Sequence, residues 1–309
     1  MFYQSIGTSK QATHQLIERR IRIREQTGYL SKLISEIRAD HPTLSCRAMY
    51  HKIQPVGIGR DAFEELCKEL GFTIERKLNL HRTTDSFGVM RFDNLLESMT
   101  LTGINQAWSS DITYYEIDGL YYYITFVMDC YSRKILGCQV SKRLTTEETT
   151  LPALQQAVQT RGGTLPVGLV FHSDGGGQYY AKSFLKFTAQ HLMQNSMCEY
   201  AYENGKAERL NGIIKNNYLI HYTIKTFKRL CKYVDRTVLL YNTDRPHKAL
   251  KYLTPDEYEN KCILLQQQTK PKMTESLNAN IQLKGAFSPN QLEQTKPPTP
   301  DVFPQIYVD

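Results

Sequence analysis

The sequence predicts an α/β fold in which a mixed five-stranded sheet is flanked by helices and preceded by an all-helical N-terminal region. Three observations predict it. Segments rich in Ile, Val, Tyr, Thr and Phe follow one another between residues 107 and 140. Helical patterns then alternate with shorter apolar runs, and residues 1–75 show helical periodicity. Of the 309 residues 41% are hydrophobic, so the chain can bury the core of one large or two modest domains.

The predicted N-terminal region, residues 1–75, is helical and charged. A glycine turn at residues 55–59 separates two of its helices, which is compatible with a helix-turn-helix-like DNA-binding unit. A small helical packing domain is the alternative. We expect the first helix to break near Gly28, because glycine weakens a helix interior. The expected helices cover residues 11–38, 44–53 and 60–70.

Residues 76–104 are predicted to be a basic connector. Its positive side chains cluster next to a polar run and could follow a phosphate backbone. A solvated loop is the alternative. The basic cluster consists of Arg76, Lys77, His81 and Arg82.

Residues 105–220 carry the predicted sheet. Asp118-Gly119 predicts a hairpin turn between the first two strands, and we expect Thr146 to cap the helix that follows the third strand. The order is three antiparallel strands, helix, strand, helix, weak strand, helix, which is compatible with a ribonuclease-H-like fold. The strands are expected at residues 107–115, 120–129, 134–140 and 167–171, and the helices at residues 146–160, 181–192 and 204–219.

The C-terminal part is predicted to be a helical extension of the core over residues 221–262, followed by a tail over residues 263–309. Thr254 is expected to cap a helix with Pro255 at its first position. From Gln266 onward the sequence is polar and rich in Gln, Pro, Thr and Lys. We therefore expect this tail to be disordered.

Composition narrows the classes of function. The net charge of +7 is consistent with a polyanionic partner. Seven cysteines at irregular spacing, with no C-x-x-C pair, argue against a disulfide framework or a zinc cluster and favour a reducing cytoplasm. The start of the chain lacks the features of a signal peptide, and no apolar run approaches the ~18 residues that span a bilayer. No membrane partner is expected.

Three acidic residues stand in interpretable contexts. Asp111 lies within an apolar strand-like run, where a carboxylate is unfavourable without a positive or metal partner. Asp174 ends an apolar run and precedes three glycines, and Glu208 lies early in a predicted helix. A turn aspartate and a favourable helix-start charge are the alternative interpretations of the latter two. Together these carboxylates predict a site for Mg²⁺, in which two ions roughly 3.5–4 Å apart would hold a phosphodiester.

Six segments of the sequence resemble a known family. They are NQAWSSDITY at residues 105–114, DCYSRKILG at 129–137, HSDGGGQY at 172–179, ENGKAER at 203–209, YNTDRPH at 241–247 and LTP at 253–255. They resemble the transposases encoded by the second frame of the two-frame insertion sequences (insertion-sequence family three), which have an integrase-superfamily Asp-Asp-Glu core. The resemblance covers about residues 5–260.

The resemblance implies an enzyme that cleaves and joins the ends of a mobile element by hydrolysis and transesterification. Asp111, Asp174 and Glu208 would be its catalytic residues and its ligands for two Mg²⁺ ions, with Mn²⁺ as a substitute. Its substrates would be double-stranded DNA, namely the terminal inverted repeats and the target. The resemblance also implies a homo-oligomer on DNA in the bacterial cytoplasm, associated with the nucleoid, and a fused or separate first-frame helix-turn-helix protein.

Six residues are candidates for contact with DNA. Each also has a structural alternative: a solvated helix face for those around Glu208, ordering of the turn for those around Asp174, and capping of a helical segment for the last one. The candidates are Lys206, Arg209, Lys215, His172, Gln178 and Arg245.

Departures from the family leave some alternatives open. The 33 residues between Asp174 and Glu208 are slightly fewer than is usual, so Glu203 could replace Glu208. Asp129, another nearby acid, is interpreted as a turn residue. A metal-dependent nuclease on the same fold and a catalytically silent or regulatory relic share most of these features. A retroviral-type integrase would need a zinc-binding His-His-Cys-Cys unit, whose spacing is absent from the sequence.

Overall fold

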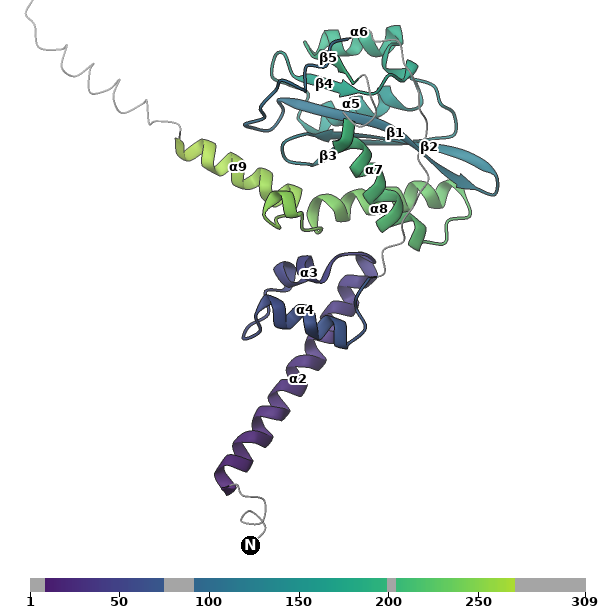
Figure 1. The fold of residues 1–309 in the computed structure, drawn as a ribbon. Coiled ribbons are helices and arrows are strands. Elements are labelled where there is room, and N and C mark those ends of the chain that lie inside the picture. The colour runs from purple at the N-terminus through teal and green to yellow at the C-terminus, as the bar shows by residue number, and fades with distance from the viewer. Residues whose placement is uncertain (1–8, 75–91, 199–203, 270–309) are drawn as a thin grey trace, which may run out of the picture. The chain divides into compact units, whose positions relative to one another are not determined.

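A computed structural model describes residues 9–74, 92–198 and 204–269 of the chain (Figure 1). The chain divides into two units, Met1–Ile263 and Leu264–Asp309, and only the helical residues up to Thr269 are described in the second. The basic cluster expected in the connector, the alternative Glu203 and most of the expected tail lie outside the described residues.

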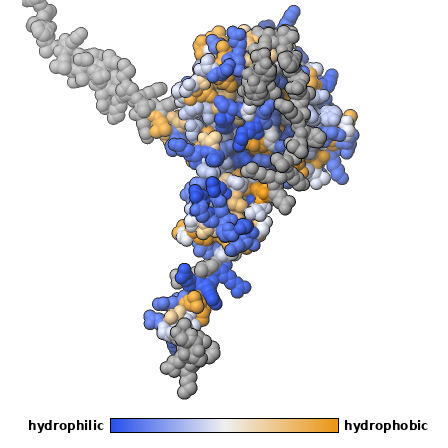
Figure 2. All heavy atoms as spheres, viewed as in Figure 1, coloured by the Kyte–Doolittle hydropathy of each residue, from blue (hydrophilic) through white to orange (hydrophobic). Residues whose placement is uncertain are grey.

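The N-terminal region is helical, as predicted. Ser9 caps its first helix by accepting a hydrogen bond from the backbone N–H of Ala12. That helix runs without a break through Gly28, so the predicted interruption is wrong. Figure 2 shows mostly hydrophilic side chains over this region, with scattered hydrophobic patches. The helices are α2 (Lys10–Asp40), α3 (Cys46–Ile53) and α4 (Arg60–Glu69), and their common core contains Leu30, Ile34, Leu44, Met49 and Phe63.

The sheet has five strands in the order β3-β2-β1-β4-β5. β1 pairs antiparallel with β2, and β2 with β3, whereas β1–β4 and β4–β5 are parallel. Asp118 and Gly119 form the β1–β2 turn with φ of 49° and 80°. The predicted mixed five-stranded, ribonuclease-H-like fold is confirmed. The strands are β1 (Ala107–Ile117), β2 (Leu120–Asp129), β3 (Ile135–Ser141), β4 (Val170–Ser173) and β5 (Gln194–Met197).

Helices cover both faces of the sheet, because alternate strand residues feed two separate cores. Trp108, Val127 and Leu136 pack against α5 (Thr150–Thr160) and α6 (Lys182–Gln190). A Cβ at Gly137 would collide with the backbone of Ala153, so α5 lies directly on β3. The second core lies under α7 (Gly205–Asn217) and α8 (Phe227–Thr243), and it contains Ile124, Phe126, Met128, Leu210, Ile214, Leu230 and Val234.

Thr146 has a different role from the predicted one. The helix begins at Thr150, and the Thr146 hydroxyl instead donates to the carbonyl of Gln178 at 3.0 Å. The Thr150 hydroxyl donates to the same carbonyl at 3.2 Å. Gln178 lies in a short 3-10 helix, η1 (Gly177–Tyr179), so the two threonines tie the start of α5 to the turn that follows Asp174.

The C-terminal helix α9 (Pro255–Thr269) begins as predicted. The Thr254 hydroxyl accepts from the Glu257 backbone N–H, and the Glu257 carboxylate accepts from the Thr254 N–H, which is a capping box. α9 continues to Thr269. The predicted start of the disordered tail is therefore several residues too early. The other segments in this part are η3 (Leu219–His221) and η4 (Lys248–Leu250).

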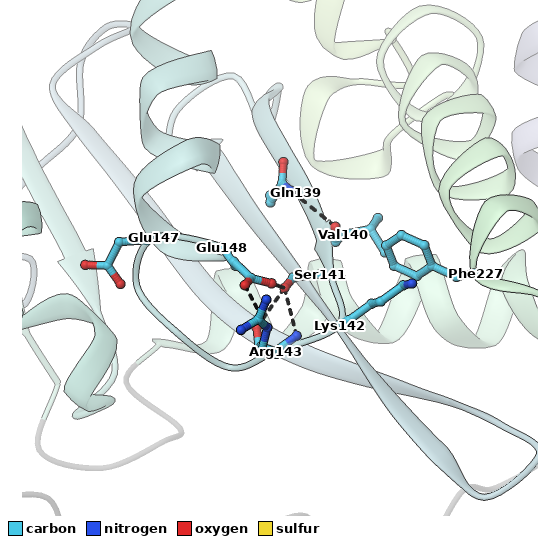
Figure 3. A pocket seen from close by; sticks show the side chains of 8 residues that line it. All are labelled: Gln139, Val140, Ser141, Lys142, Arg143, Glu147, Glu148 and Phe227. Carbon is cyan, nitrogen blue, oxygen red and sulfur yellow. Dashed lines mark hydrogen bonds and ion pairs between the residues drawn. The ribbon is translucent and has the colours of Figure 1, made fainter.

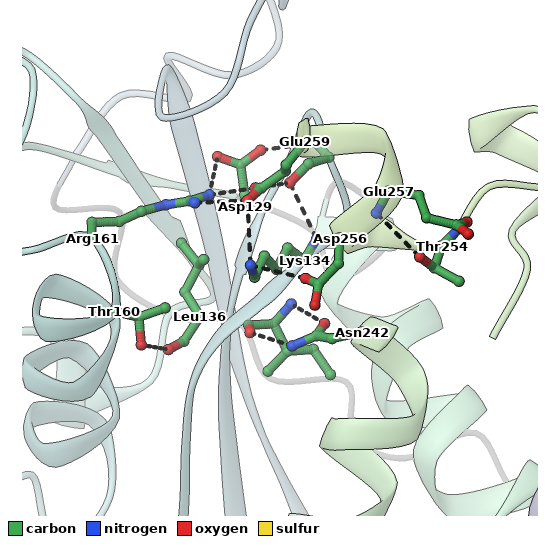
Figure 4. Close-up of polar contacts among 12 residues, drawn as sticks. Asp129, Lys134, Leu136, Thr160, Arg161, Asn242, Thr254, Asp256, Glu257 and Glu259 are labelled. Carbon is green, nitrogen blue, oxygen red and sulfur yellow. Dashed lines mark hydrogen bonds and ion pairs between the residues drawn. The ribbon is translucent and has the colours of Figure 1, made fainter. Parts of the chain in front are cut away.

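A buried ion-pair network attaches the first turns of α9 to the sheet (Figure 4). Arg161 donates to both carboxylate oxygens of Glu259, at 2.8 and 2.5 Å, and lies 3.7 Å from Asp129. The Ser132 hydroxyl donates to Glu259 at 2.6 Å. Lys134 pairs with Asp256 at 2.8 Å. These contacts connect α5, the β2–β3 turn and α9.

Candidate active site

Asp111 lies on β1 with each of its carboxylate oxygens held by one donor. Oδ1 accepts from the backbone N–H of Ile112 and Oδ2 from the side-chain amide of Asn211, both at 2.8 Å. Burial, together with the negative charges of Asp174 and Glu208, raises the pKa of Asp111 to about 7. The sequence places this acid in an apolar strand, and the structure gives it no positive partner among the described residues.

Asp174 follows β4 directly, in the turn made by the glycines. Its Oδ1 accepts from the backbone N–H of Gly176 at 3.2 Å. A Cβ at Gly176 would lie 3.1 Å from both Asp174 Oδ1 and Gln178 Oε1, so a side chain there would push these two groups from their positions. Burial raises the pKa of Asp174, although the backbone hydrogen bonds counteract this.

Glu208 is exposed in the first turn of α7. Burial of its carboxyl group, and then the charge of Asp174, raise its pKa. Asp174 thus acts on the pKa of both other acids, and Glu208 acts on that of Asp111. Asp111 and Glu208 therefore both lie near Asp174. Within the described residues no three acidic, His or Cys side chains are close enough to form a ready-made metal site.

The donor set nevertheless suits a divalent cation. All three groups are carboxylates, the hard oxygen ligands that Mg²⁺ and Mn²⁺ prefer. Burial raises the pKa of each group, and for Asp111 and Glu208 the charge of a neighbouring carboxylate raises it further. A cation would relieve this repulsion, so the residues fit the predicted ion.

The basic candidates around Glu208 differ in their surroundings. Arg209 is exposed on α7. The Lys206 amine is partly buried, which lowers its pKa, and the charges acting on it come from the β2–β3 turn. Lys215 Nζ lies 4.6 Å from the ring centroid of Tyr114, and burial lowers its pKa. Arg209 and Lys215 remain available for contact with a phosphate.

The other candidates have structural partners. His172 is fully buried and its Nδ1 lies 3.0 Å from the Ser196 hydroxyl, so it cannot contact DNA in this structure. Gln178 donates to the carbonyl of Leu144 at 3.3 Å, which favours ordering of the turn. Arg245 lies over the ring of Tyr218, 5.7 Å from its centroid.

Asp129 is a turn residue, as predicted. It is fully buried, and its Oδ1 accepts from the backbone N–H groups of Tyr131 and Ser132, both at 2.9 Å. Its Oδ2 accepts from the N–H of Asn105 at 2.7 Å. These bonds order the β2–β3 connection.

Comparisons with known proteins show which protein families this chain is similar to. Residues 102–202 and 193–255 match two models of an integrase core domain, which together include Asp111, Asp174 and Glu208. The uncharacterised 31 kDa protein of insertion element IS600 from Shigella sonnei is 28% identical over 269 residues, 84% of this chain and 97% of that protein. The transposase InsF of insertion sequence IS3A from Escherichia coli K12 is 30% identical over 176 residues.

The chain contains an integrase core domain and is similar to the transposases of insertion sequences. The predicted resemblance is confirmed. The match to InsF covers 55% of this chain and 59% of InsF, so the chain spans little more than half of that relative. Among solved structures, the catalytic core domain of HTLV-2 integrase in complex with magnesium matches 51% of this chain and 97% of the core domain, at 22% identity and a TM-score of 0.42.

The integrase core also contains residues whose part in the site the sequence did not reveal. The Ser110 hydroxyl lies 2.9 Å from the Tyr179 hydroxyl, and the Ser110 carbonyl accepts from Asn204 at 3.0 Å. Helical spacing already places Asn211 on the face of Glu208. Its contact with Asp111 spans 100 residues of sequence, and no local pattern predicts it.

Two hollows of the described surface lie away from the three carboxylates. One is at the end of β3, between the loop before α5 and the start of α8 (Figure 3). There Ser141, Arg143 and Glu148 bond to one another, so its polar groups are already satisfied. No described helix is long and apolar enough to cross a membrane.

Proposed function

We propose that this chain is a DNA transposase whose Asp111, Asp174 and Glu208 form the reactive centre for cleaving and joining the ends of a mobile element. The observation that carries the proposal is that Asp111 and Glu208, from β1 and α7, both lie near enough to Asp174 at the end of β4 for its charge to raise their pKa values. It occurs within the segment that matches the integrase core. Catalytic carboxylates in other enzymes show the same accumulation of charge.

Two divalent cations, Mg²⁺ or Mn²⁺, are the cofactors of the proposal, with the three carboxylates as their protein ligands. Such ions neutralise charge on a phosphodiester and favour ionisation of the attacking oxygen. The chain's own contribution is orientation. Asn211 and the Ile112 N–H fix Asp111, and the Gly176 turn fixes Asp174.

Both chemical steps are displacements at phosphorus. In cleavage, the oxygen of water bonds to phosphorus, and the DNA 3′-oxygen leaves and takes up a proton. In joining, that 3′-hydroxyl loses its proton and bonds to a target phosphorus, whose former 3′-oxygen leaves. One phosphodiester replaces another, so joining needs no external energy source. No protein nucleophile is required.

The proposed substrates are double-stranded element ends and target DNA. Arg209 and Lys215 are the favoured phosphate contacts, with Lys206, Gln178 and Arg245 as further candidates. By the same proposal, residues 1–75 contact DNA in a helix-turn-helix-like manner, and residues 76–104 connect this region to the catalytic core. The core comprises residues 105–220, and residues 221–262 are its helical extension. A homo-oligomer on DNA and a first-frame helix-turn-helix partner belong to the proposal as well.

A cleavage assay with an Asp174→Asn variant tests the proposal. Purified protein, labelled element-end DNA and Mn²⁺ or Mg²⁺ should give a nick at the element end. The variant should lose about 100-fold or more in rate, because one ion ligand is gone, while its DNA binding in a mobility-shift assay stays within about twofold. Full cleavage by the variant would overturn the assignment of the site. If the wild type bound DNA without cleaving it, the chain would be a catalytically silent relic. If it cleaved DNA without joining strands, it would be a nuclease.

A further inference from the structure

Two asparagines of α7 hold adjacent residues of β1. Asn204, at the N-terminus of α7, donates its side-chain amide to the Ser110 carbonyl at 3.0 Å. Asn211 donates to Asp111 Oδ2 at 2.8 Å. Seven residues separate the two asparagines, close to two helical turns, so both lie on one face of α7. Glu208 lies between them in the sequence.

Both asparagines are buried with one acceptor unused. Asn204 is 3% exposed and Asn211 is 8% exposed. In the described part of the chain the Oδ1 atoms of both find no hydrogen-bond partner. An unsatisfied buried acceptor lowers the stability of a fold. An apolar side chain would fill the space at position 211 without that loss, so packing alone does not account for an amide there.

Apolar packing, and not the asparagine hydrogen bonds, attaches α7 to the sheet. Leu210 and Ile214 are fully buried in the core between α7, α8 and the sheet. The helix would remain docked without the Asn211 hydrogen bond. The bond therefore acts chiefly on the group that accepts it, the Asp111 carboxylate.

The geometry at Asp111 shows how the Asn211 hydrogen bond affects its carboxylate. One donor holds each carboxylate oxygen, Ile112 N–H on Oδ1 and Asn211 on Oδ2, which fixes the rotation of the group. Each oxygen of a carboxylate can accept two bonds. One lone pair per oxygen therefore stays free, in a fixed direction, for a cation.

We propose that Asn211 is a positioning residue of the transposase site, which orients the Asp111 carboxylate for the divalent cation, while Asn204 sets the height of α7 along β1. This inference rests on the proposed function for the presence of the cation. Groups that hydrogen-bond to a metal ligand typically change metal affinity 10–100-fold when removed. Mg²⁺ requires nearly ideal octahedral geometry, so it should be more sensitive than Mn²⁺ to a misaligned carboxylate.

Titration calorimetry of the full chain with Mg²⁺ alone and with Mn²⁺ alone tests the inference without DNA or catalysis. Asn211→Ala should weaken Mg²⁺ binding about 10–100-fold, and Mn²⁺ binding by a clearly smaller factor. Asn211→Leu, which removes the unsatisfied acceptor, should show the same split. Asn216→Ala is the matched control, since Asn216 is on the same helix and makes no hydrogen bond to β1 within the described residues. Melting curves without metal report on folding.

The outcomes separate the inference from the proposed function. Unchanged Mg²⁺ affinity in both Asn211 variants overturns the inference alone, provided that Asp174→Asn lowers the affinity. Equal losses for the two ions, accompanied by a lower melting temperature, also overturn it, because they indicate a purely structural role. A wild-type chain that binds neither ion overturns the proposed function and the inference with it.

Discussion

At the scale of single residues, the site depends on how closely the backbone of Gly176 approaches the Asp174 carboxylate. Gly176 has an ordinary extended backbone, which any residue can adopt. Glycine is therefore favoured here because it lacks a side chain, and not because of its conformational freedom. Its hypothetical Cβ would press on Asp174 Oδ1 and Gln178 Oε1, each at 3.1 Å. Gly177, the next residue, has no atom within 4 Å of the same position. These neighbours therefore make a matched pair.

Gly176→Ala should displace the Asp174 carboxylate and slow cleavage by about 10–100-fold, because small misplacements of reacting groups are costly. Gly177→Ala should keep the rate within about threefold. Single-turnover cleavage rates in Mn²⁺, with melting temperatures as a check on folding, measure both variants. Equal rates for the two variants would show that the position of Asp174 does not limit the reaction.

At the scale of residues, the sequence identified functional acids best where their immediate neighbours in the sequence are unusual. The apolar surroundings of Asp111 and the glycines after Asp174 identify unusual carboxylates without a structure. The role of Asn211 could not be predicted, since its partner lies 100 residues away. Thr146 shows the same limit, because its hydroxyl prefers the carbonyl of Gln178 to the start of its own helix.

At the scale of elements, α9 is held by a buried charge pair. Burial would raise the pKa of Glu259, but hydrogen bonds from Arg161 and Ser132 outweigh it, and the pKa lies below its ordinary value. The ionised form therefore stabilises the fold above the ordinary pKa of a glutamate. This stabilisation is lost as the pH falls through the lower pKa of the folded state.

Glu259→Gln should lower the free energy of unfolding by about 3–5 kcal/mol at pH 7, because Arg161 would keep a buried charge with only the more distant Asp129, at 3.7 Å, beside it. Glu64→Gln breaks the more exposed pair with Arg47 and should cost less than about 1 kcal/mol. Urea unfolding measures both. The difference between wild type and Glu259→Gln should shrink as the pH falls below about 4.5. A difference that is independent of pH would contradict the ion-pair account.

Most strands and their order along the chain could be inferred from the sequence because β-rich runs and turn residues are local signals. The helix boundaries were less accessible. Gly28 costs a helix only about 1 kcal/mol, and a 31-residue helix with Leu30 and Ile34 in a core tolerates that loss. The end of α9 was missed because polar Gln residues are compatible with both helix and tail.

At the scale of the molecule, the helical region is bonded to the integrase core. Buried His41, which follows α2, lies 2.7 Å from both the Tyr218 hydroxyl and Asp244. Lys52 of α3 also pairs with Asp244. Arg236 of α8 pairs with Asp40 at 2.5 Å. Burial lowers the pKa of His41 despite the carboxylate beside it, so the two contacts of His41 are mainly hydrogen bonds at neutral pH.

His41→Ala should uncouple the two regions, because it removes the buried hydrogen bonds to Asp244 and Tyr218. The chain has one tryptophan, Trp108, which is fully buried in β1 and reports on the core. Circular dichroism and Trp108 fluorescence should give one urea transition in wild type and separated transitions in the variant. His14→Ala, on the exposed face of α2, should behave as wild type. Coincident transitions in His41→Ala would contradict this coupling.

The central claim is that three carboxylates of one integrase core carry out strand joining, and a joining assay tests it most directly. Purified chain, a precut element end and plasmid target would be incubated in Mg²⁺ and in Mn²⁺. We predict joined products for the wild type, and a loss of about 100-fold or more for each of Asp111→Asn, Asp174→Asn and Glu208→Gln. Arg209→Gln, next to Glu208, should lose far less. Undiminished joining by any of the three acid variants would contradict the claim.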